Sequence, residues 1–278
     1  MRIRTIALAA LVLLLSVAAP CAFAQAQAAA PAQAATDQEL AKKLANPIAS
    51  MVSFPIQLNY DTGFGPTGSG SRLLTNVQPV LPIALGKSWN LVSRTILPIV
   101  SQSEMYPGGG RQFGIGDITQ SAFFSPVAPT KGGLIWGAGP VLLLPTATDD
   151  LLGGDKWGAG PTFVVLKQTG PQTIGMLANH IWSVAGDDDR PDVSSTFIQP
   201  FLSYTTKKAT TYMLNSEATY DWKSDEWSVP INLQAGQMTR FGAQRVSVGA
   251  AIRYWAHSPP GGADGFGLRL FVTYLFPK

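Results

Sequence analysis

The sequence predicts an all-β fold, an antiparallel transmembrane β-barrel of about 12 strands that follows a signal peptide and a short N-terminal helix. Three observations carry this prediction. From residue 51 onward, segments of about ten residues alternate polar and apolar side chains. The breaks between these segments alternate in length, and aromatic side chains recur at segment ends. A strand of about 9–11 residues can cross a bilayer at a tilt, and the other two features are typical of outer-membrane barrels.

The N-terminus predicts export. Arg2 and Arg4 precede an apolar run over residues 6–19, and Ala22-Phe-Ala24 has the small-x-small pattern of a cleavage site. This order is typical of a secretory signal peptide, and the run is too short and wrongly flanked for a membrane-spanning helix. We therefore expect a signal peptide at 1–24, an Ala/Gln-rich linker with a short helix at 25–47, and an outer-membrane β-barrel at 48–278.

The linker ends in a predicted helix. Thr36 and Glu39 have the spacing of a capping box, in which each side chain bonds the backbone N–H of the other residue, so a helix is expected over 37–44. Asn46-Pro47 then stops it. This helix is either a plug or periplasmic cap for the barrel or a plain amphipathic lead-in to the first strand, and we favour the lead-in.

Composition and charge exclude several classes of function. Charged residues make up 13% of the chain, with 20 basic and 17 acidic side chains, and the balance is close to neutral without Arg2 and Arg4. Since the basic residues form no stripe, nucleic acid is not an expected partner. Cys21, the only cysteine, lies within the predicted signal peptide, so no disulfide or Cys-based metal site is expected. Pro20 just before it argues against lipidation, and no cofactor is predicted.

Twelve segments carry the strand pattern. They are 51–60, 71–85, 89–102, 113–126, 134–146, 157–168, 172–184, 193–205, 210–221, 227–235, 245–255 and 265–276. Long breaks follow the first, third, fifth, seventh and eleventh segments, and short breaks follow the second, sixth and eighth. Long loops on one side and short turns on the other are typical of outer-membrane barrels. Two breaks depart from this rule, because 222–226 is short where a long loop is expected and 236–244 is long where a short turn is expected.

Side-chain alternation assigns the charged residues to the inside of the barrel. In the last segment, for example, Phe266 and Leu268 share one face and Arg269 lies on the other. A charge on the lipid face at mid-depth costs roughly 2–4 kcal/mol, so charged side chains must point inward. The predicted lumen-facing, solute-contacting residues are Arg72, Arg94, Asp117, Glu217, Arg245, Arg253 and Arg269. The arginine excess either favours anions and the polar groups of aromatic acids or forms a structural ladder with Asp117 and Glu217 that closes the lumen, and the sequence supports both equally.

The five residues Trp-Gly-Ala-Gly-Pro occur twice, at 136–140 and 157–161. We interpret the copies as the starts of two successive antiparallel strands, which places Trp136 near the periplasmic rim and Trp157 near the outer rim. Proline within strands is the main objection to the barrel, because each one removes a hydrogen bond from the ladder. The prolines concerned are Pro55, Pro79, Pro82, Pro98, Pro140, Pro200 and Pro230. Either bulges absorb them or they mark strand ends.

Several longer motifs carry a family resemblance. They are Phe113-Gly-Ile-Gly-Asp117, Trp136-Gly-Ala-Gly-Pro140, Lys156-Trp-Gly-Ala-Gly-Pro161, Asn179-His-Ile-Trp-Ser-Val-Ala-Gly186, Gln199-Pro-Phe-Leu-Ser-Tyr204 and Glu217-Ala-Thr-Tyr-Asp-Trp222. On these motifs the chain from Ala45 to Lys278 resembles a bacterial outer-membrane transporter family, often mislabelled neuromedin U, which is similar to the group named for the MetA pathway of phenol degradation. The resemblance implies an outer-membrane β-barrel of uncertain substrate and supplies no catalytic residues.

Three other residue groups suggest chemistry less strongly. His180 suggests an outer-membrane lipid hydrolase, but its strand neighbour Asn179 points to the opposite face and cannot orient it. Asp187-Asp-Asp189 with Asp192 suggests a Ca²⁺ site, yet the spacing matches no defined loop, and a solvated outer loop is the better interpretation. No helix follows the glycines at 108–110, so a phosphate cradle is not supported.

Three hypotheses for function follow. The first, which we prefer, is an outer-membrane channel or transporter that passes small, aromatic or anionic solutes by passive diffusion. The second is a lipid-modifying hydrolase centred on His180, and the third is a closed structural barrel. The expected partners are outer-membrane lipid, a small-molecule solute and the outer-membrane assembly machinery. The chain is not expected to be an enzyme.

Overall fold

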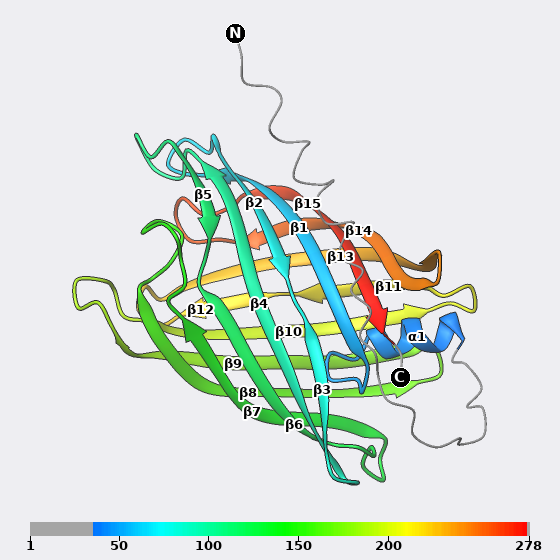
Figure 1. Ribbon diagram of the computed structural model, residues 1–278. Coiled ribbons are helices and arrows are strands. Elements are labelled where there is room, and N and C mark those ends of the chain that lie inside the picture. The colour runs from blue at the N-terminus through cyan, green and yellow to red at the C-terminus, as the bar shows by residue number, and fades with distance from the viewer. Residues whose placement is uncertain (1–35, 277–278) are drawn as a thin grey trace. The chain divides into compact units, whose positions relative to one another are not determined.

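The computed structural model describes residues 36–276 and confirms the all-β fold (Figure 1). The predicted signal peptide at 1–24 and the linker residues 25–35 lie outside the described residues. The elements are α1 (Asp37–Leu44), β1 (Val52–Phe64), β2 (Gly70–Val77), β3 (Val80–Leu85), β4 (Trp89–Ser103), β5 (Arg111–Ile115), β6 (Ile118–Pro126), β7 (Leu134–Leu144), β8 (Lys156–Thr169), β9 (Gln172–Gly186), β10 (Ser194–Thr205), β11 (Thr210–Ser216), β12 (Ala218–Asp221), β13 (Glu226–Phe241), β14 (Gln244–His257) and β15 (Gly265–Phe276).

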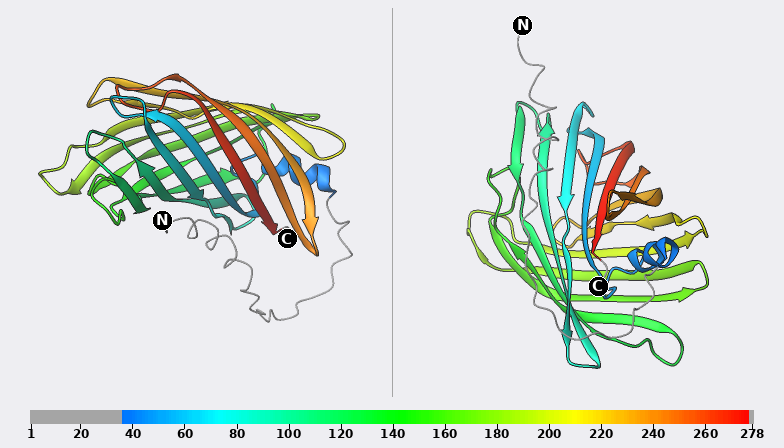
Figure 2. Two further views of the ribbon diagram at one scale, coloured as in Figure 1. Left: turned by 90° about the horizontal axis from the view of Figure 1, so that it is seen from above. Right: turned by 45° about the vertical axis from the view of Figure 1, so that its right-hand side comes forward.

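These segments form a closed barrel of twelve antiparallel strands (Figure 1 and Figure 2). Strands that follow one another in sequence pair with one another, and β1 closes the ring against β15, from Val52 opposite Phe276 to Tyr60 opposite Leu268. Three strands are each built from two segments. β2 and β3 share one position between β1 and β4, β5 and β6 both pair with β4, and β11 and β12 both lie between β10 and β13. Each of the twelve predicted segments therefore corresponds to one strand.

Prolines explain where strands are interrupted. The break between β2 and β3 lies at Gln78 and Pro79, opposite Pro55 of β1, whose carbonyl accepts a hydrogen bond from Gln78 N at 2.8 Å. The break between β11 and β12 lies at Glu217, whose backbone N–H faces the carbonyl of Pro230 on β13 at 3.4 Å. Because proline has no N–H to donate, the regular ladder lapses beside it. The barrel thus accommodates some prolines beside local interruptions of strands. Others are neither at bulges nor at strand ends, because Pro82, Pro140 and Pro200 lie within the continuous strands β3, β7 and β10.

The repeated Trp-Gly-Ala-Gly-Pro motif lies on two adjacent strands. Pro140 of β7 stands directly opposite Pro161 of β8. Gly139 and Gly160 lie against the backbone carbonyls of the outer neighbouring strands β6 and β9, too close for a Cβ at either position. The motif therefore makes the same close approach twice, once on each side of the proline pair, and glycine is required because no other residue lacks a Cβ.

The loop predicted at 236–244 is wrong. β13 continues to Phe241 and β14 begins at Gln244, so only Gly242 and Ala243 form this turn, and Gly242 has a positive φ of 60°. The polar stretch resembled a loop because strands at the rim of a barrel leave the apolar part of the bilayer and tolerate polar side chains. With this correction a short turn stands where the alternation requires one. The break after β12, at residues 222–225, is short, as the sequence indicated.

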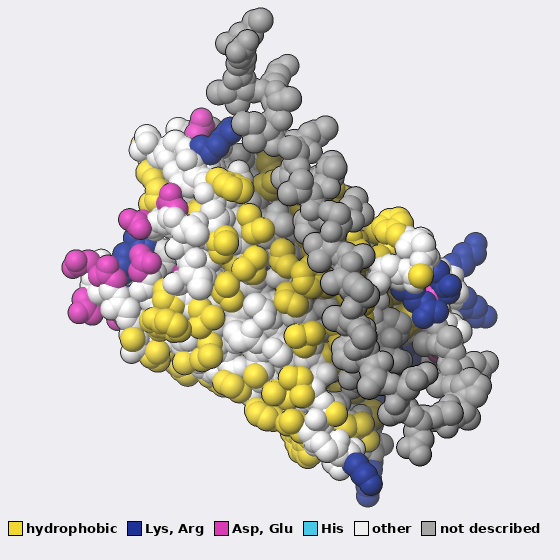
Figure 3. All heavy atoms as spheres, viewed as in Figure 1, with side chains coloured by type: hydrophobic (Ala, Val, Ile, Leu, Met, Phe, Trp, Pro, Cys, Tyr) yellow, Lys and Arg dark blue, Asp and Glu magenta, His cyan; other side chains and the backbone are white. Residues whose placement is uncertain are grey.

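The outer wall is apolar and the inner side is not. On β15, Phe266 is 70% exposed, whereas the side chain of Arg269 points inward with only 2% of its surface exposed. Figure 3 shows apolar side chains spread over the outer wall, with most acidic side chains gathered at one end and basic side chains at both ends. An exposed apolar surface this large is stable only when hydrocarbon covers it.

Among residues 36–276, no helix has the length and apolarity needed to cross a membrane.

Aromatic side chains mark both rims of the wall. Trp89 and Trp136, at the starts of β4 and β7, meet edge to face at 5.9 Å at the end that carries the short turns. Trp157 lies at the opposite end, where β8 begins after a long loop, and Tyr220 and Trp222 pack there at 4.8 Å. Short turns are typical of the periplasmic side. The two tryptophans of the repeated motif therefore occupy opposite rims, as predicted.

Candidate functional site

The candidate site is the interior of the barrel, and its first component is the N-terminal segment, residues 36–51. Helix α1 opens this segment with the predicted capping box. Thr36 N donates to Glu39 Oε2 at 2.8 Å, and Glu39 N donates to Thr36 Oγ1 at 3.2 Å. The hydrogen bonds from the backbone N–H and the hydroxyl of Thr36 hold the pKa of the Glu39 carboxyl below its ordinary value. The helix ends at Leu44, as the sequence predicted.

Helix α1 packs against the inner wall at the periplasmic end. Leu40 and Ala41 are buried together with Met238 of β13 and Leu275 of β15. In Figure 2 the helix lies at the periplasmic mouth of the barrel, beside the ends of the strands. The helix is therefore part of the interior, which matches the plug or cap interpretation rather than the lead-in that we favoured from the sequence.

Polar contacts hold the same helix to three strands. Asp37 Oδ1 lies 3.3 Å from Arg245 Nε and 3.5 Å from Arg240 Nη2. Gln168 Nε2 of β8 donates to the carbonyl of Lys42 at 2.9 Å. Arg245 points inward, as predicted, but its partner is the N-terminal segment. Its contact is therefore an anchor for the helix.

The rest of the N-terminal segment enters an apolar layer of the lumen. Ile48 is buried in one cluster with inward side chains from β3, β4, β6, β8, β9 and β10. These are Val80, Val92, Phe123, Val164, Leu166, Leu177 and Phe201. Asn90 Nδ2 donates to Ser50 Oγ at 2.9 Å beside this layer. These residues were not predicted from the sequence, because charged side chains alone were assigned to the inner face. The sequence signal that could have revealed them is a strand that is apolar on both faces, as in Phe163–Leu166.

Farther from the periplasmic end the lumen holds a neutral cluster of charges. Arg269 bonds Glu217 through Nη1 at 2.9 Å and Nη2 at 2.6 Å, and its Nε donates to Asn59 Oδ1 at 2.6 Å. Arg253 lies 3.1 Å from Asp61 Oδ1 and 3.3 Å from Glu217 Oε2. Two guanidinium groups thus face two carboxylates. Glu217, Arg253 and Arg269 were predicted to point inward. Asn59 was missed because nothing in the first strand indicates its partners, and Asp61 was missed because the first strand was predicted to end at residue 60, whereas β1 continues to Phe64.

Two other inward arginines have no such partner. Arg94 Nη2 donates to Gln78 Oε1 at 2.8 Å, and Gln78 Nε2 donates to Gln57 Oε1 at 3.0 Å. Arg72 lies 4.7 Å above the ring of Phe64, and its buried Nε has no hydrogen-bond partner among the described residues. No carboxylate of residues 36–276 lies within ion-pair distance of either guanidinium. The lumen therefore holds two arginines that form no direct ion pair with a carboxylate of the wall.

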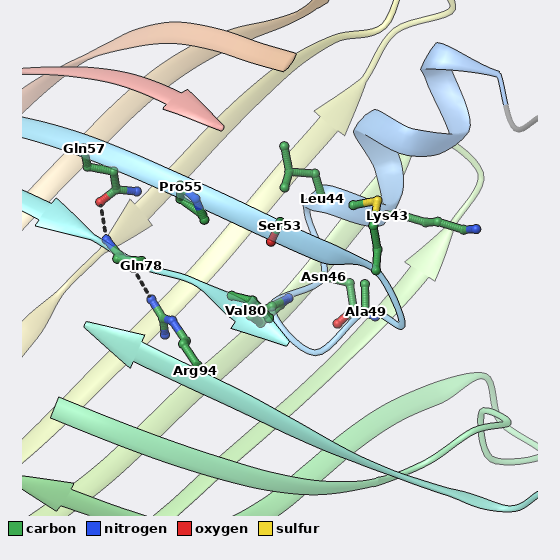
Figure 4. A pocket seen from close by; sticks show the side chains of 12 residues that line it. Lys43, Leu44, Asn46, Ala49, Ser53, Pro55, Gln57, Gln78, Val80 and Arg94 are labelled. Carbon is green, nitrogen blue, oxygen red and sulfur yellow. Dashed lines mark hydrogen bonds between the residues drawn. The ribbon is translucent and has the colours of Figure 1, made fainter. Parts of the chain in front are cut away.

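A cavity of about 130 Å³ lies beside Arg94, between the N-terminal segment and the wall (Figure 4). Leu44 and Met51 of the N-terminal segment line one side, and Val80 of β3 lines another. Figure 4 shows Gln57, Gln78 and Arg94 joined by hydrogen bonds along the cavity. This is where the N-terminal segment, the apolar layer and an unneutralised arginine meet.

Asp117 does not join the arginines, so it takes no part in the ladder with Glu217 that was one of our two interpretations of the charged lumen. It lies at the break between β5 and β6, where Gly116 N donates to the carbonyl of Pro98 at 2.9 Å. Its carboxylate accepts hydrogen bonds from Thr146 N at 3.1 Å and Gly154 N at 2.7 Å, in the long loop after β7. Asp117 thus ties an outer loop to the wall, since backbone N–H groups already occupy both oxygens.

His180 lies on the outer wall. Its Nδ1 is 2.7 Å from Thr196 Oγ1, and its ring packs 4.0 Å from the ring of Trp182 and 6.4 Å from that of Trp222. Within the described chain no carboxylate approaches this ring to hydrogen-bond distance. The surroundings are those of a histidine in an aromatic girdle and do not resemble a Ser-His-Asp triad.

The acidic outer loop is held by lysines. Asp192 lies 3.4 Å from Lys156 and 3.6 Å from Lys223, and Ser183 Oγ donates to it at 3.1 Å. The hydrogen bond from Ser183, followed by that from Lys156, holds the pKa of the Asp192 carboxyl below its ordinary value. No grouping of His, Cys, Asp and Glu suited to a metal ion occurs in the part of the chain that the structure describes.

A closed antiparallel barrel with an apolar outside, aromatic rims, long loops at one end and a charged lumen is a transmembrane β-barrel of the outer-membrane class. No family model matches the chain, and no curated protein does. Among solved structures, the chain is similar to an outer membrane channel from Pseudomonas putida F1, with a TM-score of 0.64 and 14% identity over 82% of this chain and 96% of that one. It also matches the β domain of the Bordetella autotransporter BrkA, with a TM-score of 0.46 and 9% identity over 82% of this chain and 100% of that one. The likeness to the Pseudomonas channel shows the fold.

Proposed function

We propose that the protein is a channel of the bacterial outer membrane that passes small solutes by passive diffusion and that its N-terminal segment closes the periplasmic end. The observation that carries this proposal is that the wall of the barrel and the N-terminal segment inside it are structurally separate. The wall pairs into a ring without any contribution from residues 36–51, which occupy the lumen through one apolar cluster and a few polar contacts. Such a segment can leave the lumen while every strand pair remains intact.

The proposed solutes are small anionic or aromatic molecules. Arg72 and Arg94 leave positive charge in the lumen, and a narrow pore lined by unneutralised cations favours anions. The motif resemblance to bacterial outer-membrane transporters and the fold of the Pseudomonas channel support the channel role, whereas the proposed class of solute rests on the charges of the lumen alone. In this setting the outer wall contacts outer-membrane lipid, and the solute is the transient partner of the lumen.

A reversible cross-link tests the proposal. Ser50 Oγ and Asn90 Nδ2 are 2.9 Å apart, so the S50C/N90C variant brings two thiols to bonding distance, and residues 36–276 contain no other cysteine. In planar bilayers we expect the oxidised variant to be silent and the reduced variant to conduct like the unmodified protein. The single variant S50C is the matched control and should conduct under both conditions.

Two outcomes contradict the proposal in different ways. Equal conductance of the oxidised and reduced double variant means that the N-terminal segment does not close the barrel. Absence of current steps from every form, together with no swelling of solute-loaded liposomes, selects the closed structural barrel instead. The hydrolase hypothesis gains no support, because His180 contacts a hydroxyl and two tryptophan rings.

A further inference from the structure

The cavity beside Arg94 has the charge of a binding site for an anion. Arg94 is half-buried within the lumen, and its one hydrogen bond to a side chain goes to a neutral amide, that of Gln78. A guanidinium partly removed from water with no carboxylate within ion-pair distance is poorly compensated, so a ligand that brings a carboxylate gains the direct pairing that the wall does not supply. Arg253 and Arg269 lack this property because Asp61 and Glu217 already neutralise them.

Hydrogen-bond directions in the cavity select an acceptor. Arginine can only donate, so Gln78 must turn its oxygen to Arg94 and its NH₂ group to Gln57. Gln57 in turn presents its oxygen to Gln78, which leaves its own NH₂ group without a partner among the described residues. The chain of amides thus has a surplus of donors at both ends. A ligand that fits must supply acceptor oxygens.

The remaining walls and the size define the rest of the ligand. Leu44, Met51, Pro55 and Val80 give the cavity an apolar side. Its volume of about 130 Å³ is close to the roughly 150 Å³ of an engineered apolar cavity that holds benzene. Lys43 extends away from Arg94 in Figure 4 and adds no second charge at the guanidinium. The space therefore suits one charged group attached to a body no larger than a single ring.

We propose that this cavity binds a small monocarboxylate, with the carboxylate on Arg94 and the Gln57 amide and with the apolar body against the N-terminal segment. The inference rests on the proposed function, since it names the solute class of that channel and places the bound solute at the closure. A carboxylate seated there contacts both the wall and residues 44–51, so the ligand and the closing segment meet at one point.

Calorimetric titration of the full-length protein in detergent tests this site with benzoate as the probe and benzamide as its neutral counterpart. We expect benzoate to bind and benzamide to bind at least about tenfold more weakly, because only the anion pairs with Arg94. R94Q should weaken benzoate binding by a similar factor, whereas R94K should retain part of it. R111Q makes the same charge change at an exposed arginine of β5 and should leave binding unchanged.

The Q78E variant keeps the test decisive if R94Q fails to fold. It supplies an internal carboxylate to Arg94 and should abolish benzoate binding while the arginine remains. Equal affinity for benzoate and benzamide, or equal losses in R111Q and R94Q, would overturn the inference. Binding is measured without flux, so its failure is separable from that of the channel. A protein that conducts but does not bind benzoate contradicts this site alone. A protein that binds benzoate through Arg94 but does not conduct supports the site and contradicts only the channel.

Discussion

Two interruptions of the wall place arginines in opposite situations. At the break between β11 and β12, Glu217 points into the lumen and pairs with Arg253 and Arg269. At the break between β2 and β3, Gln78 occupies the equivalent place and offers Arg94 only an amide oxygen. Both breaks exist because prolines interrupt the ladder. The side chain at the break therefore decides whether the arginine it meets is neutralised by the wall or left for a ligand.

The largest expected effect is at the first break. E217Q removes the carboxylate shared by Arg253 and Arg269 and leaves two buried guanidinium groups against Asp61 alone. Breaking a buried ion pair from one side costs roughly 3–5 kcal/mol, so the free energy of unfolding should fall by that order. Urea unfolding in lipid vesicles measures it. A loss no larger than that of an exposed substitution would remove the distinction between the breaks.

Arg269 and Arg94 should contribute differently to stability when each is replaced by glutamine. R269Q leaves Glu217 with fewer charge partners and should cost about 3 kcal/mol, because a buried carboxylate loses its shortest ion pair. R94Q removes a charge that has no carboxylate partner, and it should change the free energy of unfolding by less than about 1 kcal/mol. The same urea titration applied to both variants checks this. Equal losses would show that Arg94 is as structural as Arg269.

A carboxylate placed at the break between β2 and β3, like the one at the break between β11 and β12, should have a smaller effect on stability. Q78E places a carboxylate at the 2.8 Å contact with Arg94. Since desolvation offsets the attraction in a buried pair, the change in the free energy of unfolding should stay within about 1 kcal/mol. Ion selectivity of the conducting channel should shift away from anions, as reversal potentials in a salt gradient would show. An unchanged selectivity would place the selecting charge elsewhere in the lumen.

The smallest effect is expected at a carboxylate outside the barrel. Asp192 is exposed and has a lowered pKa, so its contribution to loop order is present above the ordinary aspartate pKa of about 3.9 and is lost as the pH falls below it. Amide hydrogen exchange over residues 183–193, corrected for the intrinsic rate, should speed up at low pH. D192N should show fast exchange at both pH values. Corrected exchange rates in this loop that do not change with pH in the unmodified protein would contradict this prediction.

Much of the wall could be predicted from local patterns, and the functional lumen only in part. The inward direction of Arg253 and Arg269 follows from alternation on β14 and β15, because side chains on a strand have a period of two. Asp117 shows where this fails. The alternation of side chains carries no information about the long loop after β7, whose backbone N–H groups donate hydrogen bonds to the Asp117 carboxylate. The strand break at Asp117 also ends the regular alternation on which its assignment rested.

The sequence alone determined the twelve strands, the apolar outside, the charged inside and the helix cap at Thr36. These follow from the cost of charge in lipid, the two-residue period and the i to i+3 geometry of a capping box, all of which act over short stretches of chain. Only the tertiary structure decided that the N-terminal segment lies in the lumen and which arginines find carboxylates. Asn59 reaches Arg269 across 210 positions of sequence, a contact set by how the barrel closes, and no local pattern encodes that closure.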